Sequence, residues 1–165
     1  MSDVPTYVIE REFDAPRDMV WRTWTEPELL ARWYGPGVET IIHKLDVTPG
    51  GLWLNEMKWG DTSMYERVEY TEAVRPERLV WLHSNADADW NVAPNPMMPV
   101  WPRVLLGTVT LREEDGRTHL RLTWAPHEAS EEEIAGFAAA IEKLDKGWGA
   151  GMKLLAELLE ELKTQ

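Results

Sequence analysis

The last fifth of the sequence predicts one long amphipathic helix, and this helix limits what the rest of the chain can fold into. Apolar residues recur at steps of three or four between Ser130 and Lys163, which places them on one side of a helix. They are Ile134, Phe137, Ile141, Leu144, Trp148, Met152, Leu155, Leu159 and Leu162. Ser130 followed by Glu133 forms a capping box at the start. At about 1.5 Å per residue the helix is about 50 Å long, so its apolar stripe needs a partner surface of similar length.

Three glycines stand close together in the middle of this helix, at Gly147, Gly149 and Gly151, on either side of Trp148. Each costs roughly 1 kcal/mol relative to alanine in a helix, so we expect a structural reason for them. One explanation is the close approach of a strand or a large side chain. The other is a helix thinned beside a cavity, with Trp148 in the cavity wall. A dinucleotide-binding loop is not expected, because it needs a strand before the glycines and a helix N-terminus after them.

Composition narrows the class of protein. A chain of 165 residues with 44% hydrophobic content is most simply a single domain, 1–165, with a core large enough to need no cross-links. The absence of cysteine excludes disulfides, thiolate metal sites and cysteine nucleophiles. A net charge of -12 argues against nucleic acid or anionic membrane as a partner. Without an apolar signal region or a membrane-length apolar stretch, we expect a soluble, cytoplasmic protein.

Tryptophan is used heavily, with ten residues against two of phenylalanine. Two explanations remain open for this bias. Indole rings line cavities well, because they offer a large apolar area with one polar edge. A core that merely needs bulky side chains would show the same composition.

Before the long helix, the patterns predict one strand, two short helices and six further strands. The first strand covers residues 6–13, and Pro16 suits the first turn of a helix. Thr25 with Glu28 reads as a second capping box that starts another short helix, which Gly35-Pro36-Gly37 ends. The remaining strands alternate with a period of two over 38–46, 52–59, 63–74, 78–84, 104–113 and 119–127.

Short connections between successive strands indicate an antiparallel meander. The predicted fold is therefore α+β: a curved sheet of seven antiparallel strands, with one apolar face wrapped around the terminal helix.

Several short motifs, in order along the chain, resemble the activator of Hsp90 ATPase homologue family of the START-like, or Bet v 1-like (SRPBCC), superfamily. They are Phe13-Asp14-Ala15-Pro16, Val20-Trp21, Trp24-Thr25-Glu26-Pro27, Leu29, Arg32-Trp33-Tyr34-Gly35-Pro36, Pro49-Gly50-Gly51, Pro76-Glu77-Arg78-Leu79-Val80, Thr118 and Gly147-Trp148. The resemblance implies a helix-grip fold, in which the curved sheet grips the C-terminal helix around a hydrophobic cavity. The superfamily includes lipid binders, polyketide cyclases and antibiotic-sequestering proteins, so the resemblance alone does not select a function.

Residues 85–102 depart from the family pattern, which has a short hairpin connection there. Four prolines exclude regular structure, yet the segment also contains Trp90, Met97, Met98 and Trp101, which suit contact with an apolar surface. The segment is either an arm packed on its own domain or on a second subunit of a homodimer, or a lid at the cavity mouth.

Alternation also selects candidate site residues. If Trp53 faces the helix, Asn55 shares its face, and Trp81 similarly brings His83 inward. Buried polar groups must be hydrogen-bonded, so Asn55 and His83 are either a structural pair or a polar handle for a ligand. If a reaction occurs, these two are the catalytic candidates, with His83 first because its ordinary pKa is near neutrality.

The other titratable residues suggest no site. His43, His119 and His127 lie on separate segments without spacing for a shared metal, and no metal or other cofactor is expected. Glu66, Glu69 and Glu72 are assigned to solvent-facing positions.

The favoured function is non-enzymatic binding of a small hydrophobic or aromatic molecule between sheet and helix. The expected ligand-binding residues are Trp53, Asn55, Met57, Trp59, Trp81, His83, Met98, Trp101, Trp124, Trp148 and Met152. One alternative is a cyclase- or hydrolase-like enzyme that uses the same cavity. The family resemblance implies another, an interaction module that binds Hsp90. Nucleic acid and membrane insertion are not expected.

Overall fold

The computed structural model describes residues 4–98 and 100–164. Its first elements are β1 (Tyr7–Phe13), α1 (Arg17–Thr25) and α2 (Pro27–Trp33). Six strands follow: β2 (Glu39–Leu45), β3 (Leu52–Trp59), β4 (Thr62–Val74), β5 (Arg78–Ala86), β6 (Leu105–Glu114) and β7 (Arg117–Pro126). The chain then enters α3 (Glu131–Lys163). The predicted class and order of elements are confirmed.

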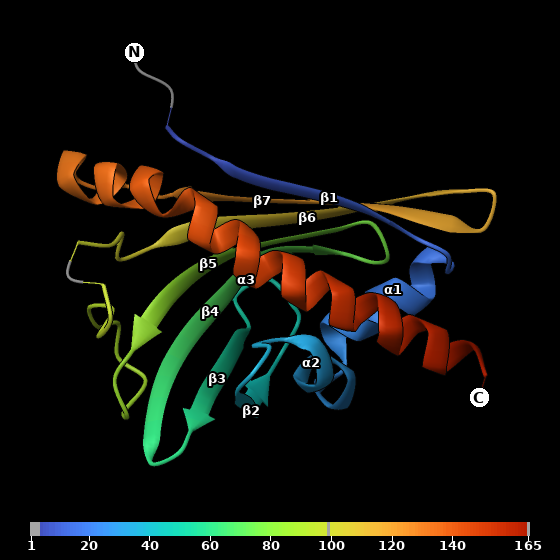
Figure 1. Ribbon diagram of the computed structural model, residues 1–165, viewed down its shortest axis with the longest axis horizontal. Coiled ribbons are helices and arrows are strands. Elements are labelled where there is room, and N and C mark those ends of the chain that lie inside the picture. Colours follow the sequence, from blue (N-terminus) through green and yellow to red (C-terminus); the bar gives the residue numbers. More distant parts are fainter. Residues whose placement is uncertain (1–3, 99, 165) are drawn as a thin grey trace.

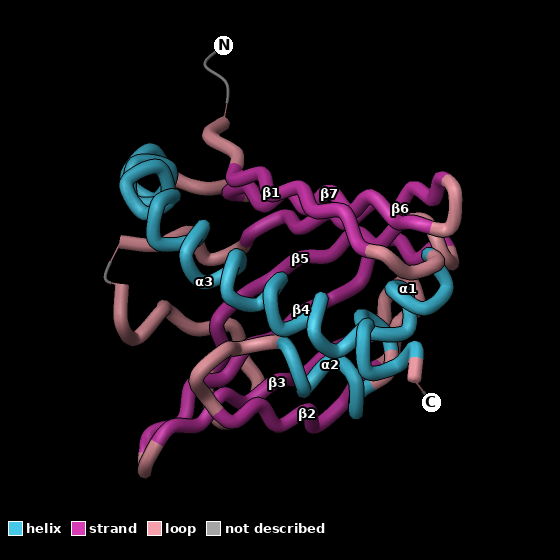
Figure 2. The backbone as a smooth tube through the Cα atoms, turned by 45° about the vertical axis from the view of Figure 1, so that its right-hand side comes forward, coloured by secondary structure: helices cyan, strands magenta, loops and turns pink. Residues whose placement is uncertain are grey.

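The strands form one antiparallel sheet in the order β1-β7-β6-β5-β4-β3-β2. The register shifts between Ile42 and Lys44 in β2, and between Tyr70 and Glu72 in β4. Such bulges bend a strand and increase its twist. The sheet accordingly curves behind α3, which crosses one of its faces (Figure 2), as a helix-grip fold requires.

The long helix begins at the predicted capping box. The Ser130 hydroxyl accepts a hydrogen bond from the Glu133 amide, and the Glu133 carboxylate accepts one from the Ser130 amide. From there α3 runs across the sheet to the end where α1 and α2 lie (Figure 1). None of the helices within the described residues is long and apolar enough to span a membrane.

The second predicted capping box is wrong. Thr25 is the last residue of α1, and its hydroxyl donates to the carbonyl oxygen of Trp21 instead of capping α2. The N-cap of α2 is Glu26, without a side-chain hydrogen bond, and Pro27 is the first helical residue. Proline has no amide hydrogen to be capped and its φ angle suits a first turn, so it starts this helix by itself.

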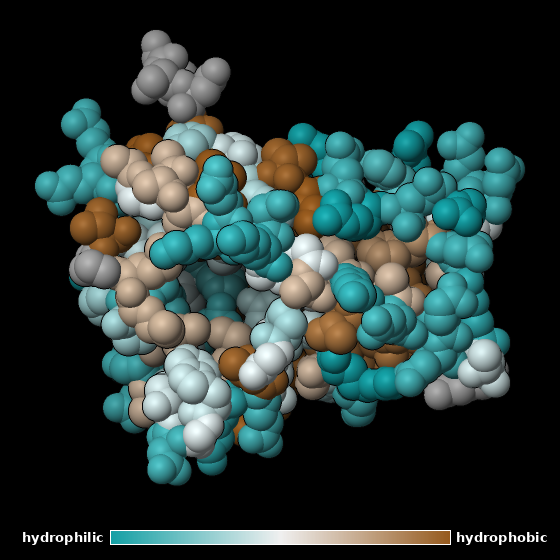
Figure 3. Space-filling view, viewed as in Figure 1, coloured by the Kyte–Doolittle hydropathy of each residue, from teal (hydrophilic) through white to brown (hydrophobic). Residues whose placement is uncertain are grey.

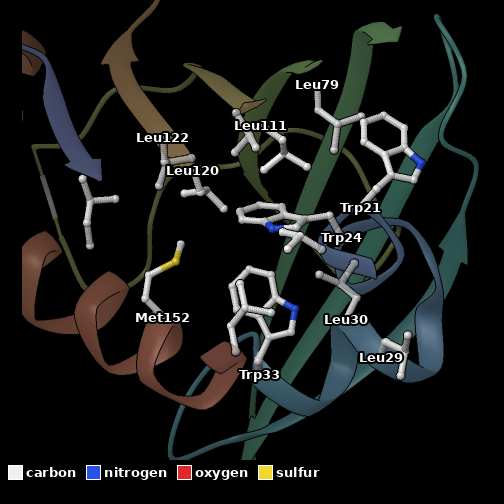
Figure 4. Close-up of a cluster of buried hydrophobic side chains, with 14 of the residues drawn as sticks. Trp21, Trp24, Leu29, Leu30, Trp33, Leu79, Leu111, Leu120, Leu122 and Met152 are labelled. Carbon is white, nitrogen blue, oxygen red and sulfur yellow. The ribbon is translucent and has the colours of Figure 1, made fainter. Parts of the chain in front are cut away.

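The solid part of the core fills the end of the sheet beneath α1, α2 and the C-terminal half of α3 (Figure 4). Trp33 is buried there, edge-on to Trp24 with ring centroids 4.7 Å apart. The Trp33 indole N–H donates to the carbonyl oxygen of Thr23 at 2.8 Å. Buried side chains of the cluster in Figure 4 include Trp21, Trp24, Leu29, Leu30, Trp33, Leu79, Leu111, Leu120, Leu122 and Met152.

The apolar stripe of α3 is not buried evenly. Its buried members lie near the start and in the C-terminal half: Phe137, Met152, Leu155, Leu159 and Leu162. The members between them are only partly buried: Ile141, Leu144 and Trp148. The middle of the helix therefore faces a region that the core does not fill.

Candidate functional site

A pocket of about 390 Å³ lies against the middle of α3. Its other walls come from the end of α2 with the turn after it, from the β3–β4 hairpin and from β7. The lining residues are Trp33, Tyr34, Gly35, Pro36, Met57, Met64, Trp124, Lys143, Leu144, Gly147, Trp148 and Gly151. The space-filling view shows a hollow beside the middle of α3, with hydrophilic residues on its floor (Figure 3).

The glycines of α3 have different surroundings. Gly147 lines the pocket, and a Cβ atom added there would have no neighbour within 4 Å. At Gly151 an added Cβ would make ordinary contacts with Trp33, the nearest at 3.6 Å. At Gly149 the nearest atom would belong to Arg11, outside the pocket, at 3.8 Å. The explanation that the helix is thinned beside a cavity therefore applies at Gly147, where nothing packs closely.

Aromatic rings form the inner wall of the pocket. Trp148 is edge-on to Trp124 at 5.8 Å and to Tyr34 at 6.0 Å between ring centroids. The Trp148 ring also stacks on the ring of Trp24, which does not line the pocket, with ring centroids 6.4 Å apart. These contacts fix the Trp148 ring from three sides, so the wall is formed before any ligand arrives.

Two thioethers lie across from this wall. Met57 and Met64 are direct partners in the register of β3 and β4, and both line the pocket. Methionine side chains adapt to irregular apolar shapes, so this wall can adjust to the outline of a ligand.

The structure brings only part of the predicted site together. Met57, Trp124 and Trp148 line the pocket. Five predicted residues are buried but do not line it: Trp53, Asn55, Trp81, His83 and Met152. Trp59 is the last residue of β3, next to the turn into β4, and 37% of its surface is exposed. Met98 and Trp101 lie in the segment between β5 and β6, also outside the pocket wall.

Several lining residues escaped the sequence analysis. Gly35 and Pro36 were assigned to the end of a helix, and Tyr34 was named only as part of a family motif. The turn that these residues form closes one side of the pocket. Met64 carried a usable signal, since it pairs with Met57 across a tight hairpin and cross-strand partners share a face.

The outward assignment of Glu66 is wrong. On β4, Met64, Glu66, Val68 and Tyr70 alternate on the inner face, and Glu66 is only 6% exposed. Its Oε2 atom lies 2.5 Å from Nε2 of His83 on the neighbouring strand β5. A buried charged group requires such a partner, and this one is supplied by a strand whose register the sequence does not reveal.

The Glu66–His83 pair lies directly behind the pocket wall. The Tyr34 hydroxyl donates to Glu66 Oε2 at 3.4 Å, and the Trp124 ring is perpendicular to the His83 ring at 5.1 Å. Tyr34 and Trp124 both line the pocket, so they separate it from the pair by one layer of side chains.

Asn55 is fully buried on β3, directly opposite Glu66 in the register. The predicted structural pair of Asn55 with His83 is not formed within residues 4–98 and 100–164, where His83 pairs with Glu66 instead. Neither the amide nitrogen nor the amide oxygen of Asn55 has a hydrogen-bond partner among the described protein groups. Its polar atoms therefore need a partner from outside the protein chain, either water or a ligand.

Burial raises the pKa of Tyr34 well above its usual value, and the nearby Glu66 carboxylate raises that pKa further. Burial likewise raises the pKa of Tyr70, which is 2% exposed. Tyr34 is therefore a neutral hydrogen-bond donor at physiological pH.

These two raised pKa values predict that the protein loses stability above about pH 10. An unfolded tyrosine releases its proton there, whereas the folded one keeps it, so alkaline pH favours unfolding. Each tyrosine contributes up to about 1.4 kcal/mol per pH unit until its folded pKa is reached. Urea unfolding between pH 8 and 11 measures the loss, and the Tyr70→Phe variant is expected to show a shallower decline. Equal declines in both proteins would contradict the prediction.

The connection between β5 and β6, residues 87–104, ends against α3. The backbone of Val100 touches Gly136, and Trp101 packs on Phe137 and Trp124 with ring centroids 5.6 and 6.4 Å away. Trp124 lines the pocket, so this end of the connection supports the pocket wall from behind.

Gly136→Ala is expected to destabilise the protein by about 1–3 kcal/mol, although alanine favours helix. The added Cβ would overlap the carbonyl oxygen of Val100, which is backbone and must shift. Gly149→Ala is the matched control, because its Cβ has room, and it is expected to gain up to about 1 kcal/mol. Thermal unfolding compares the two, and equal midpoints would show that the connection does not rest on Gly136.

Within the described residues, no group of three or more histidine, aspartate or glutamate residues is placed to hold a metal ion.

Comparison with models of protein families matches residues 14–160 to activator of Hsp90 ATPase homolog 1-like proteins. The chain belongs to this family. The resemblance found in the sequence motifs is thereby confirmed, and so is the SRPBCC or START-like fold, which commonly binds hydrophobic ligands.

Solved structures of the same fold come from several bacteria. The superposition with a protein from Arthrobacter aurescens covers 96% of this chain and 87% of that protein, with 25% sequence identity and a TM-score of 0.80. The superposition with protein Ms6760 from Mycobacterium smegmatis covers 96% of this chain and 90% of that protein, with 26% sequence identity and a TM-score of 0.71. The superposition with a protein from Staphylococcus epidermidis covers 98% of this chain and 93% of that protein, with a TM-score of 0.77. Its sequence identity is 20%, so this likeness supports the fold alone. No functionally curated protein matches the sequence.

Proposed function

We propose that this protein binds a small hydrophobic or aromatic molecule in the pocket between the sheet and α3. The observation that carries the proposal is the pocket of about 390 Å³ on the face of α3 where Gly147 has no side chain. Its size falls within the roughly 300–1,000 Å³ that is usual for sites of small ligands.

The chemistry of the wall supports an apolar ligand. Trp124, Trp148 and Tyr34 offer flat aromatic surfaces, and Met57 and Met64 offer adaptable ones. A two-ring aromatic molecule would bury roughly 200 Å² of apolar surface, worth about 5 kcal/mol before the cost of ordering the ligand. Dissociation constants of about 0.2 mM or weaker are therefore expected for simple two-ring aromatic probes.

The neutral fluorescent probe N-phenyl-1-naphthylamine tests the proposal. Its emission should rise with a saturable, one-to-one dependence on protein concentration, because the probe leaves water for an apolar site. Absence of saturable binding, for this probe and for a panel of other apolar compounds, would refute the proposed function.

A further inference from the structure

Buried polar atoms without a protein partner gather behind the pocket. In folded proteins most such atoms are hydrogen-bonded. Here, among residues 4–98 and 100–164, no protein group pairs with Nδ2 and Oδ1 of Asn55 or with Oε1 of Glu66. Four indole N–H groups share this condition, from Trp24, Trp53, Trp81 and Trp124. Buried groups of this kind require a partner from outside the chain, either water or a ligand.

Two of these groups are direct neighbours. Asn55 and Glu66 face each other across β3 and β4, which brings Cβ atoms of such a pair to within about 4.5–5.5 Å. Both are almost completely buried, at 0% and 6% exposure. They do not satisfy one another, since the Asn55 nitrogen donates no bond to Glu66.

The two oxygens of Glu66 differ in their surroundings. Oε2 contacts His83 and accepts a hydrogen bond from Tyr34, whereas Oε1 has no partner in the described chain. The His83 and Tyr34 contacts fix the orientation of the carboxyl group. Oε1 is thus held as an acceptor beside an amide that can both donate and accept.

This arrangement selects the chemistry of a ligand. A carboxylate oxygen accepts hydrogen bonds and repels anions. A wholly apolar ligand would leave both groups unpaired, and a group that only accepts would satisfy the amide nitrogen of Asn55 but not Glu66. A neutral hydroxyl can pair with both residues, because it can donate to Glu66 Oε1 and accept from the amide nitrogen of Asn55.

We propose that the ligand carries a hydroxyl or a similar neutral hydrogen-bond donor, which is recognised by Glu66 Oε1 together with the side-chain amide of Asn55. Its apolar remainder lies against Trp124, Trp148 and the two methionines of the pocket. Tyr34 lines the pocket and is bonded to Glu66, so it lies between the two regions and has to shift to let the polar end of the ligand reach Glu66. This inference rests on the proposed function, since it concerns the polar end of the same site.

Three naphthalenes of similar size test the inference by displacement of N-phenyl-1-naphthylamine. 2-Naphthol donates and accepts hydrogen bonds, 2-methoxynaphthalene only accepts, and 2-methylnaphthalene does neither. 2-Naphthol is expected to bind about tenfold more tightly than either of the others, as a hydrogen bond to a charged group allows. In Glu66→Gln and in Asn55→Leu this advantage should fall to about threefold or less, with the affinity for 2-methylnaphthalene unchanged.

The outcomes separate this inference from the proposed function. If 2-methylnaphthalene binds as tightly as 2-naphthol, the inference is overturned and the apolar pocket stands. If 2-methoxynaphthalene equals 2-naphthol, the site recognises an acceptor, which also overturns it. If none of the probes binds, the proposed function itself fails. Should Glu66→Gln not fold, Asn55→Leu decides alone, and an undiminished advantage of 2-naphthol in that variant contradicts the inference.

Discussion

A Gly147→Leu variant is expected to lose ligand binding while it gains stability. The new side chain would grow from a helix position that lines the pocket and has no neighbour within 4 Å, so it fills the space a ligand needs. Leucine also favours helix over glycine by about 0.5–1 kcal/mol. Titration with N-phenyl-1-naphthylamine should show at least a tenfold weaker affinity, and urea unfolding should show the gain in stability.

Gly149→Leu is the matched control for this experiment. It lies in the same helix and gains the same helix propensity, but its side chain points toward Arg11 and outside the pocket wall. Its affinity for the probe is expected to stay within about twofold of the unmodified protein, well below the effect of one lost hydrogen bond. If the two leucine variants bind equally well, the pocket beside Gly147 is not the binding site.

Trp33→Ala is expected to cost about 3–5 kcal/mol of unfolding free energy. The Trp33 side chain is 1% exposed, contacts Trp24 edge-on, and bonds the carbonyl oxygen of Thr23. Its removal leaves a large cavity beside the existing pocket and an unpaired buried carbonyl. Urea unfolding followed by circular dichroism measures the loss.

Trp59→Ala provides the comparison for the same residue type. Trp59 is 37% exposed at the end of β3, so its replacement is expected to cost less than about 1 kcal/mol. A Trp33→Ala variant as stable as Trp59→Ala would show that the junction of α1, α2 and α3 is not the core of the fold.

The fold could be predicted largely from the sequence because its signals are local. The apolar spacing and the capping box at Ser130 mark α3, and the observed helix begins at the next residue. Strand limits follow from alternation and from turn residues, and they agree with the structure to within about two residues, the usual uncertainty of helix and strand ends. The error at Thr25 shows the limit of local reasoning, since the neighbouring Pro27 already determines where α2 starts.

The site could be predicted only in part, because it depends on distances between strands. Alternation placed Asn55 and His83 in the interior, where they are found. It did not reveal that Glu66, a residue type usually exposed, is the partner of His83. Nor could it show that Met57 borders open space while Trp59, two residues later, is 37% exposed at the end of β3.

Methionine methyl groups provide the most direct measurement of the central claim, that an apolar ligand lies between the sheet and α3. Met57 and Met64 line the pocket, whereas Met97 is 68% exposed in the connection between β5 and β6. In an NMR titration of methyl-labelled protein with 2-methylnaphthalene, the Met57 and Met64 signals should shift and saturate together while Met97 stays in place. Unmoved Met57 and Met64 signals, or a shift confined to Met97, would contradict the account.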